Sequence, residues 1–249
     1  MPPTRPIPRW RHIIGTILPR GCAGCGKPDE TLCETCTQAL HTPVAYPLPD
    51  TLTGHGIACG TYEGPVRHAI LSWKDHNDTE IDTPLGDALT DLFDTTATHT
   101  TALLDTHPNG LGIVPAPSTP HSTRRRGRRQ LDPLAQTLAT HCRTHGYPHT
   151  TVLPLLRTDN ARGKSVQTTG ARDRMRRING HVTIDKHIHA ATPPMPLILL
   201  DDIVTTGATM GACAHTLTEA GYDVLTALAL AYTPPKDDAR HEDGGRGKS

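Results

Sequence analysis

The chain has 249 residues, and its 25 Lys and Arg are balanced by 25 Asp and Glu, so the formal net charge is zero. Aromatic residues make up only 3% of it, with a single Phe, so a core must be packed from Leu, Ile, Val and Ala. No segment has the roughly 20 apolar residues that cross a bilayer, and residues 1–19 lack the apolar run of a secretory signal. We therefore expect a protein of the reducing cytoplasm, without membrane contact and long enough to bury a sizeable core.

The first 54 residues are predicted to form a helix, a metal-binding module and a linker. Apolar residues between Trp10 and Leu18 recur at helical spacing, and Pro19 ends the pattern. Residues 41–54 are rich in proline and are interpreted as a linker.

The metal-binding module is predicted from four cysteines with the spacing Cys-x2-Cys-x7-Cys-x2-Cys: Cys22, Cys25, Cys33 and Cys36. Four thiolates with no open position are typical of a structural, tetrahedral zinc site, and Gly24 and Gly26 suit the tight turns of such sites. A redox pair is the alternative, but two such pairs in one cytoplasmic chain favour zinc. The remaining cysteines are predicted to be packing residues: Cys59, Cys142 and Cys213.

Residues 55–232 alternate short apolar runs with helical patterns, which is typical of an α/β domain with a mostly parallel sheet flanked by helices. The predicted strands are 57–62, 111–114, 151–156, 197–200 and 223–231. The predicted helices are 66–73, 85–92, 131–138 and 208–220, the last one closed by Gly221. Residues 233–249 are polar and are predicted to form a disordered tail.

The segment 197–210, LILLDDIVTTGATM, combines a buried strand, two acids and a turn of small residues before a helix. The N–H groups at the start of that helix, the threonine hydroxyls and Gly207 favour a phosphate. Asp201 and Asp202 are expected at the carboxyl end of the strand, where open α/β sheets bind ligands. Since carboxylates repel a phosphate, we interpret both as acceptors for neighbouring sugar hydroxyls. The alternative is a plain buried strand and a capped helix, with both acids capping or hydrated.

This segment resembles the signature of type I phosphoribosyltransferases that binds phosphoribosyl pyrophosphate (PRPP): an apolar run, two acids and then TTG-A/G-T. The resemblance implies that Asp201 and Asp202 are the catalytic residues that hold the ribose hydroxyls, with Mg²⁺ on the pyrophosphate. The residues that it implies for the 5-phosphate are Thr205, Thr206, Gly207, Ala208 and Thr209.

Four further segments occur in the order found in ComF-family proteins, a phosphoribosyltransferase-like group linked to bacterial competence: CAGCGKPDETLCETC, GTYEGPVRHAILSWK, IVPAPSTPHSTRRRGRRQ and QTTGARDRMRRING. The resemblance covers roughly residues 15–232. The chain departs from the family pattern in reading RGRRQ at 126–130, where RGFNQ is usual, and in having Gly170 in place of a Leu. Lys74 matches a recurring lysine, for which ligand contact and plain surface charge both remain open.

Pro115 and Ala116 end a predicted strand, and the resemblance implies that the following loop binds pyrophosphate through backbone N–H groups. Arg126 and the other arginines of RRRGRR, residues 124–129, could then neutralise it. The resemblance further implies that the cationic stretch 157–177 takes the place of a mobile loop, which would close over the site and exclude water. The alternative for RRRGRR is a solvated nucleic-acid-binding patch, and the two uses are compatible.

The sequence thus predicts a phosphoribosyltransferase-like protein that binds PRPP and Mg²⁺ and transfers a phosphoribosyl group to a nitrogen acceptor, with release of pyrophosphate. The protein would act through positioning and electrostatic stabilisation. The alternative is a non-enzymatic, ComF-like accessory protein for DNA uptake or processing. Such a protein would bind single-stranded DNA and keep the PRPP pocket as a sensor or a relic. The acceptor and the oligomeric state are left open by the sequence.

Overall fold

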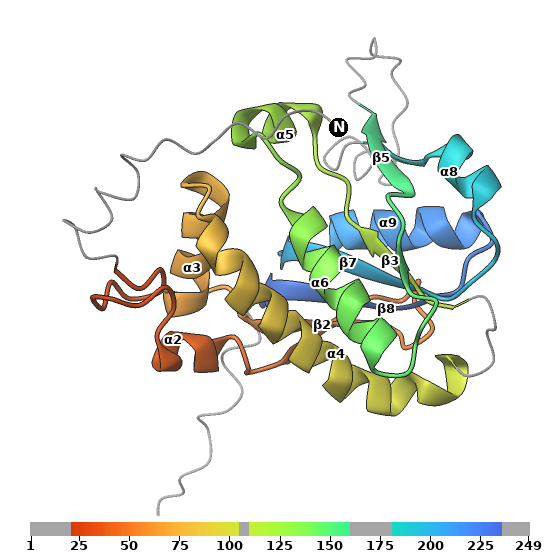
Figure 1. The fold of residues 1–249 in the computed structure, drawn as a ribbon. Helices are drawn as coiled ribbons and strands as arrows, with labels where there is room; N and C mark the ends of the chain where they lie inside the picture. The colour runs from red at the N-terminus through yellow and green to blue at the C-terminus, as the bar shows by residue number, and fades with distance from the viewer. Residues whose placement is uncertain (1–20, 105–109, 160–180, 236–249) are drawn as a thin grey trace, which may run out of the picture.

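The structure, a computed structural model, describes residues 21–104, 110–159 and 181–235 (Figure 1). Within them the chain is an α/β protein with a six-stranded sheet flanked by helices and a cluster of four cysteines near the N-terminus. The helix predicted between Trp10 and Leu18, most of the predicted mobile loop and most of the predicted tail lie outside the described residues.

The sheet has the strand order β1-β2-β8-β7-β3-β4, and only β1 runs antiparallel to its neighbour. The strands are β1 Val44–Pro47, β2 His55–Thr61, β3 Gly112–Pro115, β4 Thr151–Val152, β7 Leu197–Val204 and β8 Val224–Tyr232. All nine residues of β8 and the first four of β7 are buried. Their continuous apolar runs fit central parallel strands, which are covered on both faces. The predicted mostly parallel sheet is confirmed.

Helices cover both faces of this sheet, with α4 and α6 in front of it and α9 behind it in the view of Figure 1. The helices are α2 Glu34–Ala39, α3 Gly64–Asp75, the 3-10 turn η1 Thr79–Ile81, α4 Asp82–Leu104, α5 Pro120–Arg126, α6 Leu131–Thr144, α8 Lys186–Ala191 and α9 Ala208–Glu219. Among the described helices, none combines the length and the apolar character needed to cross a membrane. A separate antiparallel pair consists of β5 Leu156–Asp159 and β6 His181–Ile184.

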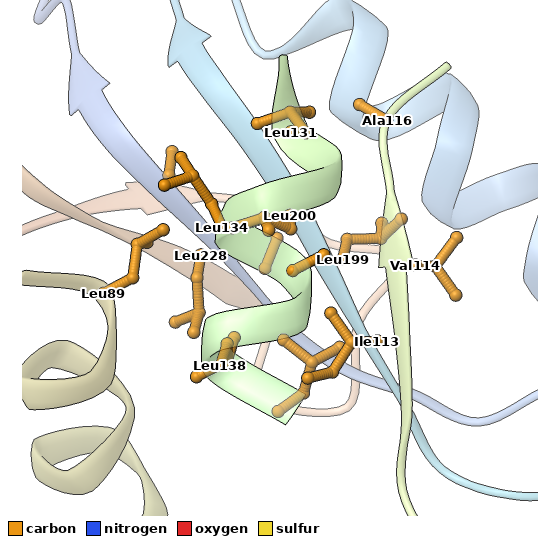
Figure 2. Packing of buried hydrophobic residues seen from close by; sticks show 14 of the residues in the cluster. Leu89, Ile113, Val114, Ala116, Leu131, Leu134, Leu138, Leu199, Leu200 and Leu228 are labelled. Carbon is orange, nitrogen blue, oxygen red and sulfur yellow. The ribbon is translucent and has the colours of Figure 1, made fainter. Parts of the chain in front are cut away.

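The core between the sheet and its front helices is aliphatic, as the composition predicts (Figure 2). Leu134 and Leu138 of α6 lie against Leu200 of β7 and Leu228 of β8, with Leu89 of α4 beside them. All five side chains are fully buried. Burying one such side chain contributes about 1.5–3 kcal/mol, so this layer fixes the position of β7 under the helices. The three lone cysteines predicted as packing residues are also fully buried: Cys59, Cys142 and Cys213.

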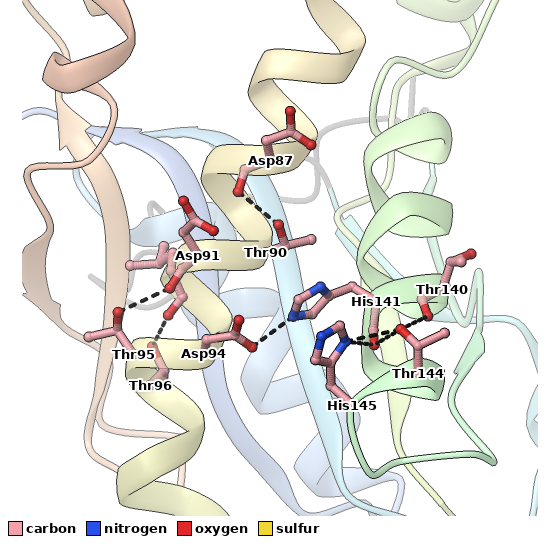
Figure 3. A network of polar contacts seen from close by, with 11 residues as sticks. Asp87, Thr90, Asp91, Asp94, Thr95, Thr96, Thr140, His141, Thr144 and His145 are labelled. Atoms are coloured by element: carbon pink, nitrogen blue, oxygen red, sulfur yellow. Dashed lines mark hydrogen bonds and ion pairs between the residues drawn. The ribbon is translucent and has the colours of Figure 1, made fainter.

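Polar contacts join α4 and α6 at the surface of this layer (Figure 3). His141 Nε2 lies 2.7 Å from Asp94 Oδ1, and the His141 ring stacks on His145 with centroids 4.0 Å apart. Thr95 and Thr96 turn their hydroxyls back onto carbonyls of their own helix, so neither disturbs it. Of these contacts, the one between His141 and Asp94 joins the two helices.

The prediction that residues 41–54 form a linker is wrong, because they include a strand of the sheet. Residues 44–47 form the edge strand β1, and Tyr46 and Leu48 are buried in the core. Leu52 N–H also bonds to Val224 O at 2.8 Å, which ties the following turn to β8. Proline is compatible with an edge strand because an outward position needs no N–H donor. The proline content therefore suggested a linker where the chain forms a sheet edge.

The strand predicted at 151–156 is split in two. β4 ends at Val152, Pro154 offers no N–H to a ladder, and Leu156 begins β5 in the other sheet. The strand predicted at 197–200 is instead longer, since β7 continues to Val204 alongside β8. Because β7 is longer than predicted, Asp201 and Asp202 lie inside the strand.

Candidate functional site

Asp201 and Asp202 lie in the second half of β7, whereas the sequence had suggested that they stand where the strand ends. Ile203 and Val204 continue the strand and pair with β8. Because successive side chains of a strand point to opposite faces, the two carboxyl groups have different surroundings. Asp201 lines a small hollow formed with the loop 205–209, and Asp202 pairs with α3.

Asp201 is partly buried, as Asp202 is. Its Oδ1 accepts the backbone N–H of Asp202 at 2.8 Å. Burial, and then the neighbouring Asp202 carboxylate, raise the pKa of Asp201 to about 8, although Lys74 opposes the shift. The raised pKa favours the protonated form of Asp201, which can donate a hydrogen bond as well as accept one.

Asp202 pairs with Lys74, for which the sequence had left both ligand contact and plain surface charge open. Lys74 Nζ, on the last turn of α3, lies 2.7 Å from Asp202 Oδ2, and each side chain is 18% exposed. A pair this enclosed is screened by solvent less than a surface pair. The contact brings α3 and β7 together at the carboxyl edge of the sheet.

The predicted phosphate loop joins β7 to α9, and it lines a hollow of about 30 Å³ together with Asp201. Gly207 is the N-cap of α9 and has a φ of 72°, the left-handed region that favours glycine. Ala208 N–H lies 3.4 Å from Thr206 Oγ1, and Thr205, Thr206 and Thr209 are exposed. The first N–H groups of α9 have no intrahelical acceptors, so this exposed helix start attracts anions.

The structure places β3 next to β7 and thereby brings Pro115 and Ala116 to the same edge. Ala116 N–H donates to Leu200 O at 2.7 Å, and Pro115 has no N–H. In this arrangement neither residue offers a backbone donor to a ligand, and the loop's next N–H belongs to Ser118. A larger hollow of about 400 Å³ begins at Pro117 and Ser118 and extends between α5, β5 and α8.

Arg126 has a defined backbone partner. Its Nε donates to Lys74 O at 3.0 Å, and Gln130 Nε2 donates to Trp73 O at 3.1 Å. The last carbonyls of a helix lack intrahelical donors, so these two side chains close the C-terminal end of α3. Arg126 thus holds the backbone of Lys74, the residue that meets Asp202.

Two other arginines of RRRGRR also have partners in the fold. Arg128 forms a two-pronged ion pair with Asp82, which also accepts Trp73 Nε1 at 2.6 Å. Arg125 lies 3.2 Å from Asp75 at the surface. The sequence did not suggest these contacts, because the acids lie about 50 positions away and no local pattern marks them.

The four predicted metal ligands come together. The Sγ atoms of Cys22, Cys25, Cys33 and Cys36 all lie within 4.8 Å of one another, the sole such group of potential ligands among the described residues. The four are free thiols, and the Cys25 and Cys33 sulfurs are 3.6 Å apart, well beyond the about 2 Å of a disulfide. Cys33 N–H donates to Cys22 Sγ at 3.2 Å, so the backbone already points a donor at one sulfur. The cluster can hold one metal ion.

The glycines of this module have the roles that tight turns require. Gly26 has a φ of +80°, and a Cβ on Gly24 would lie 2.7 Å from Cys36 Sγ. Cys36 is in α2, whose N-cap is Cys33, so the second pair of ligands spans a helix start. His68 Nδ1 lies 3.1 Å from Gly24 O, which attaches the module to α3.

Comparison with models of known protein families gives no match, and comparison with curated protein sequences gives none either. The site is therefore interpreted from its own chemistry. Two adjacent acids, an enclosed lysine and an anion-attracting helix start meet at one sheet edge, and a sulfur cluster lies on the far end of α3.

Proposed function

We propose that the carboxyl edge of β7 binds a ribose bearing a 5-phosphate, and that its natural ligand is PRPP. The observation that carries the proposal is the succession, along one chain segment, of the Asp201–Asp202 pair, a left-handed Gly207 and the exposed start of α9. The helix start and the threonine hydroxyls would bind the phosphate. The carboxyl groups would bind the ribose hydroxyls, since a carboxylate accepts strongly and a protonated carboxyl also donates.

The proposed activity is phosphoribosyl transfer of the type found in ComF-like phosphoribosyltransferases, which the five sequence motifs resemble. A nitrogen of the acceptor would bond to C1 of the ribose while the C1–O bond to pyrophosphate breaks, and the pyrophosphate would leave with the electron pair. Mg²⁺ bound to the pyrophosphate would stabilise that leaving charge. The chain itself would orient the ribose through Asp201 and Asp202, and the hollow that begins at Pro117 offers room beside the site.

We further propose that the cysteine cluster holds a structural zinc ion. Zinc–sulfur bonds of about 2.3 Å put tetrahedral sulfurs about 3.8 Å apart, and the observed grouping within 4.8 Å fits that size. Four thiolates leave no open position, so the ion would stabilise the module and take no part in the transfer.

A pyrophosphate-release assay tests the transferase proposal. The protein is incubated with PRPP, Mg²⁺ and a panel of nitrogen acceptors, with Asp202→Asn as the inactive control and Asp75→Asn as the surface control. Release that depends on an acceptor and on Asp202 supports transfer. Absence of release with every acceptor, together with PRPP binding, would limit the proposal to a binding protein.

The accessory-protein alternative predicts single-stranded DNA binding that weakens steeply with salt. Arg126 and Arg128 are engaged with partners inside the fold, which leaves fewer arginines of RRRGRR for phosphates, and Arg125 pairs with Asp75 at the surface. A fluorescence titration of single-stranded DNA at two salt concentrations measures this directly. Tight, salt-dependent binding by a protein that releases no pyrophosphate would favour the alternative.

A further inference from the structure

The acid pair of β7 has a cation of its own within the fold. Lys74 Nζ lies 2.7 Å from Asp202 Oδ2, and both side chains are largely enclosed. The same ammonium acts on Asp201 as well, since it lowers the pKa that burial raises. Lys74 is therefore coupled to both acids and not to one alone.

The backbone position of Lys74 is fixed by hydrogen bonds that do not involve its ammonium group. Its carbonyl accepts Arg126 Nε, and the preceding carbonyl of Trp73 accepts Gln130 Nε2. The Trp73 side chain is fully buried, with Nε1 bonded to Asp82. A surface lysine samples many rotamers. The backbone of Lys74 is instead anchored at the end of α3, from where its side chain reaches Asp202.

An ammonium group therefore already faces the acid pair. Lys74 Nζ lies 2.7 Å from Asp202 Oδ2, and burial together with the neighbouring carboxyl group raises the pKa of Asp201, which favours its neutral form. Two ionised acids without a nearby cation would present two negative charges beside the proposed phosphate and would repel each other and the ligand.

We propose that Lys74 is a positioning residue that replaces a divalent cation at Asp201 and Asp202, so that a sugar 5-phosphate binds at these acids without metal. The inference rests on the proposed function, because it assumes that Asp202 meets the ribose hydroxyls. In this proposal Mg²⁺ is needed to bind the pyrophosphate of PRPP and is not needed to bind the sugar. Ribose 5-phosphate, which lacks a pyrophosphate, separates the two requirements.

Calorimetric titration of ribose 5-phosphate in EDTA and again in Mg²⁺ tests the proposal. Wild-type affinity is expected to agree within about twofold between the two buffers. Lys74→Met keeps the alkyl stem and removes the charge, so its affinity in EDTA is expected to fall about tenfold or more, as for loss of a charged hydrogen bond. Mg²⁺ is expected to restore part of that loss, and Lys74→Arg is expected to retain binding in EDTA. Lys186→Met, on the exposed start of α8, is the matched control and is expected to behave as wild type.

The outcomes separate this inference from the proposed function. Wild-type binding that requires Mg²⁺ would overturn the inference and leave the proposed function standing. The same holds for a folded Lys74→Met protein that binds as wild type, or that loses affinity equally in both buffers, as a purely structural lysine would. Absence of wild-type binding in both buffers would overturn the proposed function and the inference with it. If Lys74→Met does not fold, the wild-type and Lys74→Arg titrations still decide the question.

Discussion

Gly24→Ala adds one methyl group where the two halves of the cysteine cluster come closest. The new Cβ would lie 2.7 Å from Cys36 Sγ and 2.8 Å from Cys36 Cβ, separations that real Cβ atoms do not show. Cys36 cannot retreat freely, because it belongs to α2 and its sulfur must stay with the other three. Overpacking of this kind costs about 1–3 kcal/mol, so we expect zinc affinity to fall about tenfold to a hundredfold.

The assay for Gly24→Ala is competition for zinc with a chromophoric chelator, read alongside the zinc content of the purified protein. Gly211→Ala makes the same chemical change in α9, where nothing lies within 4 Å of the new methyl group. We expect that control to keep wild-type zinc affinity. A Gly24→Ala protein that holds one zinc ion with unchanged affinity would refute the packing argument.

Three further substitutions test the fold around the site. Asp82→Ala leaves Arg128 and Trp73 Nε1 without their acceptor, and we expect a loss of about 2–3 kcal/mol in urea unfolding; a loss below about 0.5 kcal/mol would contradict the structural role of this ion pair. Burial and then the Asp202 charge raise the pKa of Asp201 to about 8 in the folded state, whereas its pKa in the unfolded chain is near 4. The stability that the raised pKa contributes is therefore complete below about pH 4 and is lost as the pH rises towards 8. Asp201→Asn should accordingly gain stability relative to wild type as the pH rises between pH 5 and pH 9. A difference in stability that does not change with pH would contradict the assignment. Gly207→Ala should cost about 1 kcal/mol of unfolding free energy from its φ of 72°, and unchanged stability would argue against the left-handed turn.

The central sheet could be predicted from the sequence because its inner strands are marked by local composition. The apolar runs at 197–200 and 223–231 have no alternation, which indicates burial on both faces, and both lie in central parallel strands. Gly221, with a φ of 87°, follows the end of α9 as its position suggested. The cysteine cluster was equally predictable, since its ligand spacing is itself local.

Contacts between distant segments could not be predicted in the same way. Arg128 finds Asp82 only after the segment between α5 and α6 lies against the start of α4, and Lys74 finds Asp202 only after α3 lies beside β7. Whether an arginine meets a ligand or an acid of its own chain depends on that packing, so RRRGRR suggested arginines that neutralise a pyrophosphate or bind nucleic acid and did not suggest partners within the fold. The extension of β7 to Val204 also depends on its neighbour, because β8 supplies the pairing partners. Local pattern therefore predicted which residues gather at the site, but not which of them already have partners.

The central claim, that the acids of β7 hold the sugar of a phosphoribosyl ligand, is tested most directly by calorimetric titration of PRPP with Mg²⁺ into wild type, Asp202→Asn and Asp75→Asn. Asp75 is an exposed acid at the end of α3, about half exposed and paired with Arg125, and it serves as the matched control. We expect Asp202→Asn to weaken binding about tenfold or more, as for loss of a charged hydrogen bond, and Asp75→Asn to bind as wild type. Equal affinity of all three folded proteins for PRPP would contradict the claim.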